Sequence, residues 1–140
     1  MAALLALPAC GGGDTLPTTP PSPTIRLPAV PGRPAAGYFD LQIDGDRGAL
    51  LSVAAPQARR IEMHETMSSG KMTSMRPLER IPVRDGERLS FSPGGRHLML
   101  YDLDPALRPG SEIILTFHFE RGNPRTLAAR VRAAGDGPPH

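Results

Sequence analysis

Histidine and methionine side chains are concentrated in one segment of this 140-residue chain. Five of the six methionines and two of the four histidines lie between positions 63 and 99. The spacing is His64, ten residues, Met75, twenty-one residues, and then His97-Leu98-Met99. Methionines that only fill gaps in a core would be scattered among the strands. The concentration therefore predicts that some of them are ligands.

Imidazole nitrogens and thioether sulfurs together indicate a particular class of metal ion. A thioether is uncharged and soft, so it selects Cu(I) over Zn²⁺, Mg²⁺ or Ca²⁺, which prefer nitrogen, thiolate or oxygen ligands. Thiolates in an oxidising compartment become disulfides, whereas thioethers do not and need no deprotonation. Two histidines and two methionines would therefore suit one Cu(I) ion in such a compartment.

The segments that carry these residues have the alternating pattern of β-strands. Apolar residues alternate with polar or metal-binding ones in the runs 61–64 and 97–100, and successive strand side chains point to opposite faces. His64 should therefore lie off the core face of its strand, as His97 and Met99 lie off theirs. If the two strands are neighbours, two imidazoles and two thioethers can converge at one end of the domain.

The other methionines of the segment have different expected roles. Residues 67–75 contain three methionines and a glycine, and we interpret them as a polar loop that Met75 closes. Met67 and Met72 should form a flexible apolar rim, with shielding of the metal or transient ligation as the alternative. Met63 alternates onto the core face, so we expect it to pack there.

The remaining composition argues against other function classes. His118 lies on a polar strand face beside Glu120 and should be solvated, and His140 is a single histidine in the tail. The chain has neither a Ser/His/Asp arrangement in a plausible context nor a carboxylate pair near the histidines, so we do not expect an enzyme. The formal net charge is +2 and the arginines are scattered, so nucleic acid is not an expected partner.

Several further runs also alternate, and no window shows a helical period. Seven or eight short strands, spaced by roughly ten residues with turn signals between them, predict an antiparallel β-sandwich or barrel. Two of these strands flank Asp85-Gly86, which is a hairpin signal. The alternating runs are residues 36–44, 49–55, 59–65, 80–92, 96–103, 111–120 and 125–133.

The beginning of the sequence resembles a bacterial lipoprotein signal. A short apolar run, too short to span a bilayer, ends in Leu7-Pro8-Ala9-Cys10, which resembles a lipobox with Cys10 as the lipidated residue. Cys10 is the single cysteine, so it has no intrachain disulfide partner. We expect an exported protein anchored to a membrane by lipid, on the periplasmic side. The predicted organisation is 1–9 signal segment, 10–23 lipidated Cys10 and Pro-rich flexible linker, 24–134 copper-binding domain, and 135–140 disordered tail.

The spacing His-x10-Met-x21-His-x-Met, with "MRPL" at 75–78 and "GGRHLMLYDL" at 94–103, closely resembles the PCuAC family of periplasmic copper chaperones. The resemblance runs from about position 36 to 131, and "PGSEIILTFHFE" at 109–120 also looks like the family. The departures are the turn "QIDGDRG" and Lys71, which fall on none of the ligand positions. Residue by residue, the family's four ligands fall on His64, Met75, His97 and Met99.

This resemblance implies an all-β fold, an antiparallel Greek-key β-sandwich of cupredoxin type that binds one Cu(I). It implies a copper carrier that exchanges copper with periplasmic donors or acceptors, such as the CuA centre of cytochrome c oxidase. We expect this carrier to be a monomer. Two alternatives stay open, a lipoprotein that sequesters copper for tolerance and a β-sandwich lipoprotein without metal. An electron-transfer cupredoxin is disfavoured, because its site needs a Cys thiolate with two histidines and Cys10 lies outside the domain.

Overall fold

The structure is a computed structural model that describes residues 22–134. In this part of the chain every regular element is a β-strand, and no helix long and apolar enough to cross a membrane is found. The predicted all-β class is confirmed. The ten strands are β1 (Thr24–Arg26), β2 (Ala35–Gln42), β3 (Ala49–Ala54), β4 (Ala58–Ser69), β5 (Met72–Leu78), β6 (Ile81–Pro82), β7 (Arg88–Phe91), β8 (Arg96–Leu103), β9 (Glu112–Phe119) and β10 (Arg125–Arg132).

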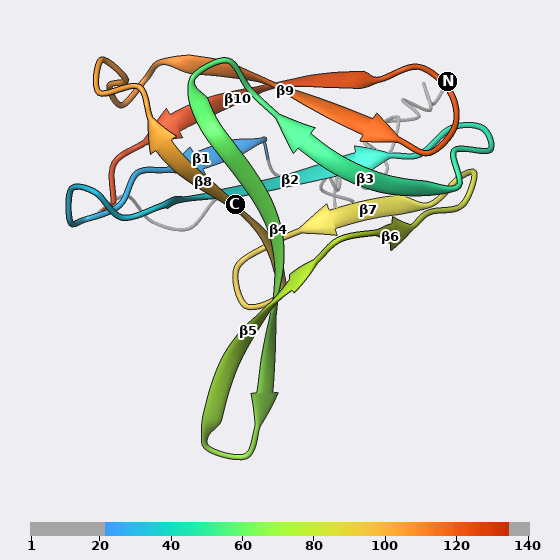
Figure 1. The fold of residues 1–140 in the computed structure, drawn as a ribbon, viewed down its shortest axis with the longest axis horizontal. Helices are drawn as coiled ribbons and strands as arrows, with labels where there is room; N and C mark the ends of the chain where they lie inside the picture. The colour runs from blue at the N-terminus through green and yellow to red at the C-terminus, as the bar shows by residue number, and fades with distance from the viewer. Residues whose placement is uncertain (1–21, 135–140) are drawn as a thin grey trace, which may run out of the picture.

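The strands form one hydrogen-bonded path in the order β5-β4-β8-β2-β1-β10-β9-β3-β6, and β7 pairs with β2 beside this path. The path folds over itself as a β-sandwich, which is the predicted architecture (Figure 1). One pairing departs from the predicted antiparallel pattern, because the short strand β1 runs parallel to β10 and antiparallel to β2. Insertion of β1 between these strands links the start of the domain to its last strand.

The core forms from the inward residues of alternating strands. Buried and more exposed positions alternate along β2 and β9, as period-two side chains require when one face is covered. Phe39 lies at the centre, with its ring centroid 4.5 Å from that of Phe91 and 4.7 Å from that of Phe117. The cluster consists of hydrophobic side chains, and His97, which is 6% exposed, is a buried polar residue outside it.

The predicted loop at 67–75 is wrong, because this segment is part of a long β-hairpin. β4 continues to Ser69, the chain turns through Gly70 at a φ of 62°, and β5 returns along it. Glycine suits this turn because the left-handed region costs it no Cβ clash. Beyond Glu65 the strand β4 pairs only with β5, and the two strands project away from the sandwich (Figure 1). We call residues 66–75 the arm.

The predicted hairpin around Asp85-Gly86 is also wrong, although the turn exists. β6 pairs with β3 and β7 pairs with β2, so the two strands belong to different parts of the sheet. The turn instead joins the segment after β2, because the Gly86 amide donates to the Ile43 carbonyl at 2.9 Å. The Gly45 amide likewise donates to the Asp85 carboxylate at 2.8 Å.

Candidate metal centre

The candidate ligands come from three adjacent strands at the root of the arm. In the antiparallel register His64 on β4 lies directly opposite His97 on β8, and Glu62 lies opposite Met99. Across the other edge of β4, Thr66 lies opposite Met75 on β5. Directly opposed residues and every second residue along a strand share a face. The register therefore places all four predicted ligands, His64, Met75, His97 and Met99, on the same face of β5-β4-β8.

The two imidazoles are close, and each has one ring nitrogen held by the protein. The ring centroids of His64 and His97 are 5.9 Å apart. Nε2 of His64 lies 3.1 Å from the Glu62 carboxylate, and Nδ1 of His97 lies 3.3 Å from the Gly95 carbonyl. Carboxylate and carbonyl oxygens only accept hydrogen bonds, so these two nitrogens carry the protons. The other nitrogen of each neutral ring keeps its lone pair.

Those other nitrogens, Nδ1 of His64 and Nε2 of His97, are buried and have no hydrogen-bond partner within residues 22–134. A buried polar atom without a partner costs free energy, and it needs an explanation. A metal-binding histidine usually donates its second N–H to a carboxylate or carbonyl while the first nitrogen binds the metal. The hydrogen bonds of both rings match this arrangement, so the two histidines fit a metal ion.

The electrostatics favour a neutral ring at His97. Burial lowers the pKa of this imidazole below its ordinary value, the hydrogen bond to Gly95 partly offsets the effect, and the nearby His64 lowers it further. The side chain is only 6% exposed. The hydrogen bond from His64 is the main cause that lowers the pKa of the Glu62 carboxyl. Glu62 therefore stays charged and remains an acceptor.

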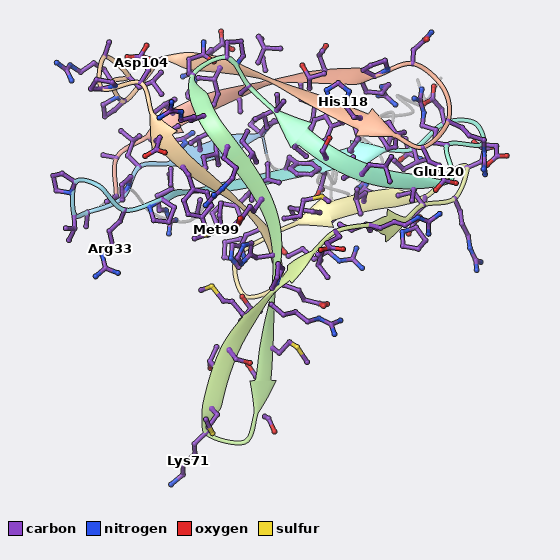
Figure 2. All side chains as sticks on the ribbon, viewed as in Figure 1. Arg33, Lys71, Met99, Asp104, His118 and Glu120 are labelled. Atoms are coloured by element: carbon purple, nitrogen blue, oxygen red, sulfur yellow. The ribbon has the colours of Figure 1, made fainter. Side chains whose placement is uncertain are left out.

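The two methionines differ in their surroundings. Met99 is half-buried on β8, whereas Met75 is 59% exposed on β5. Figure 2 shows Met99 near the level where the arm leaves the sandwich and Lys71 at the tip of the arm. No cluster of three or more His, Cys, Asp or Glu side chains able to hold a metal occurs among residues 22–134. A metal at this place would therefore depend on the thioethers.

The remaining predicted roles have mixed outcomes. Met63 is 4% exposed and packs in the core, as predicted. His118 is exposed on β9, opposite Ser52 and away from the arm (Figure 2), as predicted. Met67 and Met72 are exposed, as an apolar rim requires. Their positions in the strands place them on the face of the arm opposite to His64 and Met75, so the expected alternative of shielding a metal there does not fit.

Two residues of the site, Glu62 and Gly95, were not singled out in the sequence. Glu62 holds His64, and Gly95 accepts hydrogen bonds from both His97 and the Thr66 amide, the latter at 3.0 Å. Gly95 thus joins β8 to the start of the arm. The position of Glu62, two residues before His64 on one strand face, is a signal that could have found it. The predicted lipidation site Cys10 and the tail residue His140 lie outside the described residues.

Solved structures share this fold. The Cu(I)-bound solution structure of DR1885 from Deinococcus radiodurans superposes with a TM-score of 0.58 and 29% sequence identity, covering 87% of this chain and 83% of that one. The copper-bound PCuAC domain from PmoF2 shares the fold with a TM-score of 0.63 at 23% identity, covering 81% and 91%. The molecule is a PCuAC-type β-sandwich, which confirms the resemblance seen in the sequence.

The chain belongs to the LpqE-like family, whose model, described as "Putative lipoprotein LpqE-like", matches residues 20–131. "Uncharacterized protein RP573" of Rickettsia prowazekii is 26% identical over 117 residues, which are 83% of this chain and 64% of that protein. "Putative lipoprotein Lxx21020" of Leifsonia xyli subsp. xyli is 29% identical over 101 residues, 69% of this chain and 60% of that protein. The chain spans less than two thirds of the length of these curated relatives.

Proposed function

We propose that this protein binds one Cu(I) ion through His64, Met75, His97 and Met99 and passes it to a recipient protein. The observation that carries this proposal is the pair of facing imidazoles, each with one nitrogen held and one buried nitrogen without a partner within residues 22–134. The thioethers on the same face make the donor set soft, which favours Cu(I) over divalent ions. The copper-bound states of DR1885 and of the PmoF2 domain support the metal assignment.

The exposure of Met75 favours transfer over permanent storage. Copper moves between proteins by ligand exchange, so an incoming donor atom must reach the ion while some of the first ligands still hold it. Met75 is 59% exposed on the arm and can leave the ion without opening the sandwich. Sequestration would be better served by four covered ligands. The resemblance to PCuAC proteins supports the CuA centre of cytochrome c oxidase as a recipient.

The place of action is part of the same proposal. Membership of a family described as lipoproteins supports acylation of Cys10 and attachment to a membrane. Several acyl chains anchor a protein stably, whereas one anchors only marginally. The site would then work on the periplasmic side, near membrane-bound acceptors. Mass spectrometry of the native protein tests this directly, and an unmodified thiol at Cys10 in the membrane fraction would contradict it.

Titration of Cu(I) against a chromophoric Cu(I) chelator tests the ligand set. The variant Met75→Leu/Met99→Leu keeps nearly the same side-chain volume but removes both sulfurs, so Cu(I) affinity should fall strongly. The matched control is Met67→Leu, which also removes a sulfur from the arm but on its other face. Equal affinity of the double variant and the parent would refute the site. Transfer is tested by mixing the loaded protein with an apo CuA domain, separating the two proteins and measuring the copper in each, where retention of all the copper by this protein would favour sequestration.

A further inference from the structure

Glu62 lies at the centre of a small polar group on one face of β4 and β8. Its Oε2 lies 3.1 Å from Nε2 of His64, and its Oε1 lies 3.4 Å from Nε of Arg60. Burial is the largest cause that raises the pKa of the Tyr101 hydroxyl, and the negative charge of the adjacent Glu62 carboxylate is the second largest. Arg60 in turn lies over the ring of Tyr101, with its Cζ 4.3 Å from the centroid. Arg60 and Tyr101 therefore restrain the carboxylate in addition to its contact with His64.

The strand register explains why these residues meet. Arg60, Glu62 and His64 alternate along β4 and so share one face. Tyr101 lies directly opposite Arg60 on β8, and Met99 lies opposite Glu62. The carboxylate is thus next to a predicted ligand along its strand and opposite another across the sheet. Its own position in the register fixes it beside the site.

The contact determines which nitrogen of His64 is available. A carboxylate has acceptors only, so its partner Nε2 must carry the proton when the ring is neutral. Nδ1 then holds the lone pair, and this is the nitrogen that is buried without a hydrogen-bond partner within residues 22–134. The tautomer of a histidine is set in this way by the hydrogen bond of its second nitrogen.

We propose that Glu62 is a positioning residue that holds His64 in the Nε2–H tautomer, with Nδ1 free to bind the metal, and that Arg60 and Tyr101 hold the carboxylate in place. The effect of Glu62 on metal binding rests on the proposed Cu(I) site, whereas the tautomer of His64 does not. The two histidines would then bind the metal through different ring nitrogens, Nδ1 in His64 and Nε2 in His97. The charge of the carboxylate raises the basicity of the ring and strengthens it as a ligand.

The test compares three variants by two measurements. Glu62→Ala removes the acceptor, and Glu62→Gln keeps an acceptor oxygen without the charge. Glu65→Ala is the matched control, because Glu65 is on the same strand with similar exposure but faces the other way and pairs with Arg76 at 3.0 Å. The first measurement is ring ¹⁵N NMR of the apo protein, which reports the His64 tautomer without metal. The second is the Cu(I) affinity by chelator competition.

We expect a single Nε2–H tautomer in the parent, a mixture in Glu62→Ala, and a largely retained tautomer in Glu62→Gln. Cu(I) affinity should fall about tenfold or more in Glu62→Ala, the range found for residues that orient a metal ligand. Glu62→Gln should restore most of this loss, and Glu65→Ala should match the parent. Rescue by glutamine distinguishes positioning of the ring from a general structural role of Glu62. The control Glu65→Ala shows whether loss of any carboxylate from this strand lowers the affinity.

Two results would overturn the assignment. One is an unchanged tautomer and affinity in Glu62→Ala. The other is a higher affinity in Glu62→Ala, which would mean that Glu62 competes with copper for Nε2 of His64. Failure of the proposed function has a different signature, because His64→Ala would then bind Cu(I) like the parent while the apo tautomer still responded to Glu62.

Discussion

His97 and Met75 belong to one candidate site but to two different parts of the molecule. His97 is on β8, which is paired on both sides, and its side chain is 6% exposed. Met75 is on β5, an edge strand of the arm, and its side chain is 59% exposed. The sandwich part of the site has the rigidity of a packed sheet, whereas a two-stranded ribbon by itself is only marginally stable.

This difference suggests how one site can both hold and release an ion. Rigid ligands lose little conformational entropy when the metal binds, so they contribute most of the affinity. A ligand on a weakly stabilised element costs more to order and leaves more easily. The sandwich would therefore determine how tightly copper is held, and the arm would determine how quickly it exchanges.

Loss of a sandwich ligand should have the largest effect. We expect His97→Gln to weaken Cu(I) binding by about a hundredfold, which is about 2.8 kcal/mol. Glutamine keeps a polar side chain at the buried position, so the melting temperature of the apo protein should change little while the affinity falls. Competition titration and thermal unfolding of the same samples measure both. The control His118→Gln removes an exposed histidine and should bind like the parent, whereas a loss below about threefold in His97→Gln would break the division.

Loss of the arm ligand should have a smaller effect on affinity and a larger one on rate. We expect Met75→Leu to weaken Cu(I) binding by about tenfold, about 1.4 kcal/mol, with most of the change in faster dissociation. The apo stability should change by less than about 0.5 kcal/mol, because the side chain is exposed. Stopped-flow transfer to a chelator gives the dissociation rate. Met67→Leu, on the other face of the arm, controls for removal of a thioether, and equal dissociation rates in the two variants would contradict this role.

The same division explains what the sequence could predict. The strands 61–64 and 97–100 alternate strictly, so the face that carries His64 and His97 follows from period two. The pairing of those strands is non-local and needed an assumption. No side chain of residues 66–75 is buried. This segment therefore lacks the apolar alternation that marks a strand. The dipeptide Asp85-Gly86 identified a turn correctly but could not tell which strands it joins, because pairing partners are set by the whole sheet.

Copper should change the motion of the arm more than that of the sandwich. In the apo protein we expect the amides of residues 66–75 to exchange with solvent faster than those of 97–101, since the arm has few buried contacts and opens locally. The apo sandwich should stay folded, because its core does not include the ligands. Binding of Cu(I) should slow exchange in the arm while leaving β9 and β10 unchanged. Hydrogen exchange followed by NMR measures this, and uniform protection in the apo state would show that the arm is as stable as the sheet.

The smallest expected effect is a pH dependence of apo stability that arises from the sandwich part of the site. The pKa of His97 is lowered in the folded protein, mainly by burial, whereas in the unfolded chain it should be near 6.5. Between these two values the unfolded state binds more protons than the folded state, so acid favours unfolding. The contribution of His97 to stability is therefore complete above about pH 6.5 and is lost as the pH falls from there toward the lower folded value.

Urea unfolding of the copper-free protein at a series of pH values should show a steeper decline in this window for the parent than for His97→Gln. His118→Gln again controls for the removal of one imidazole. If His97→Gln had the same pH profile as the parent, burial of His97 would not be the source of the decline, and the contrast between a covered sandwich ligand and an exposed arm ligand would lose its electrostatic part.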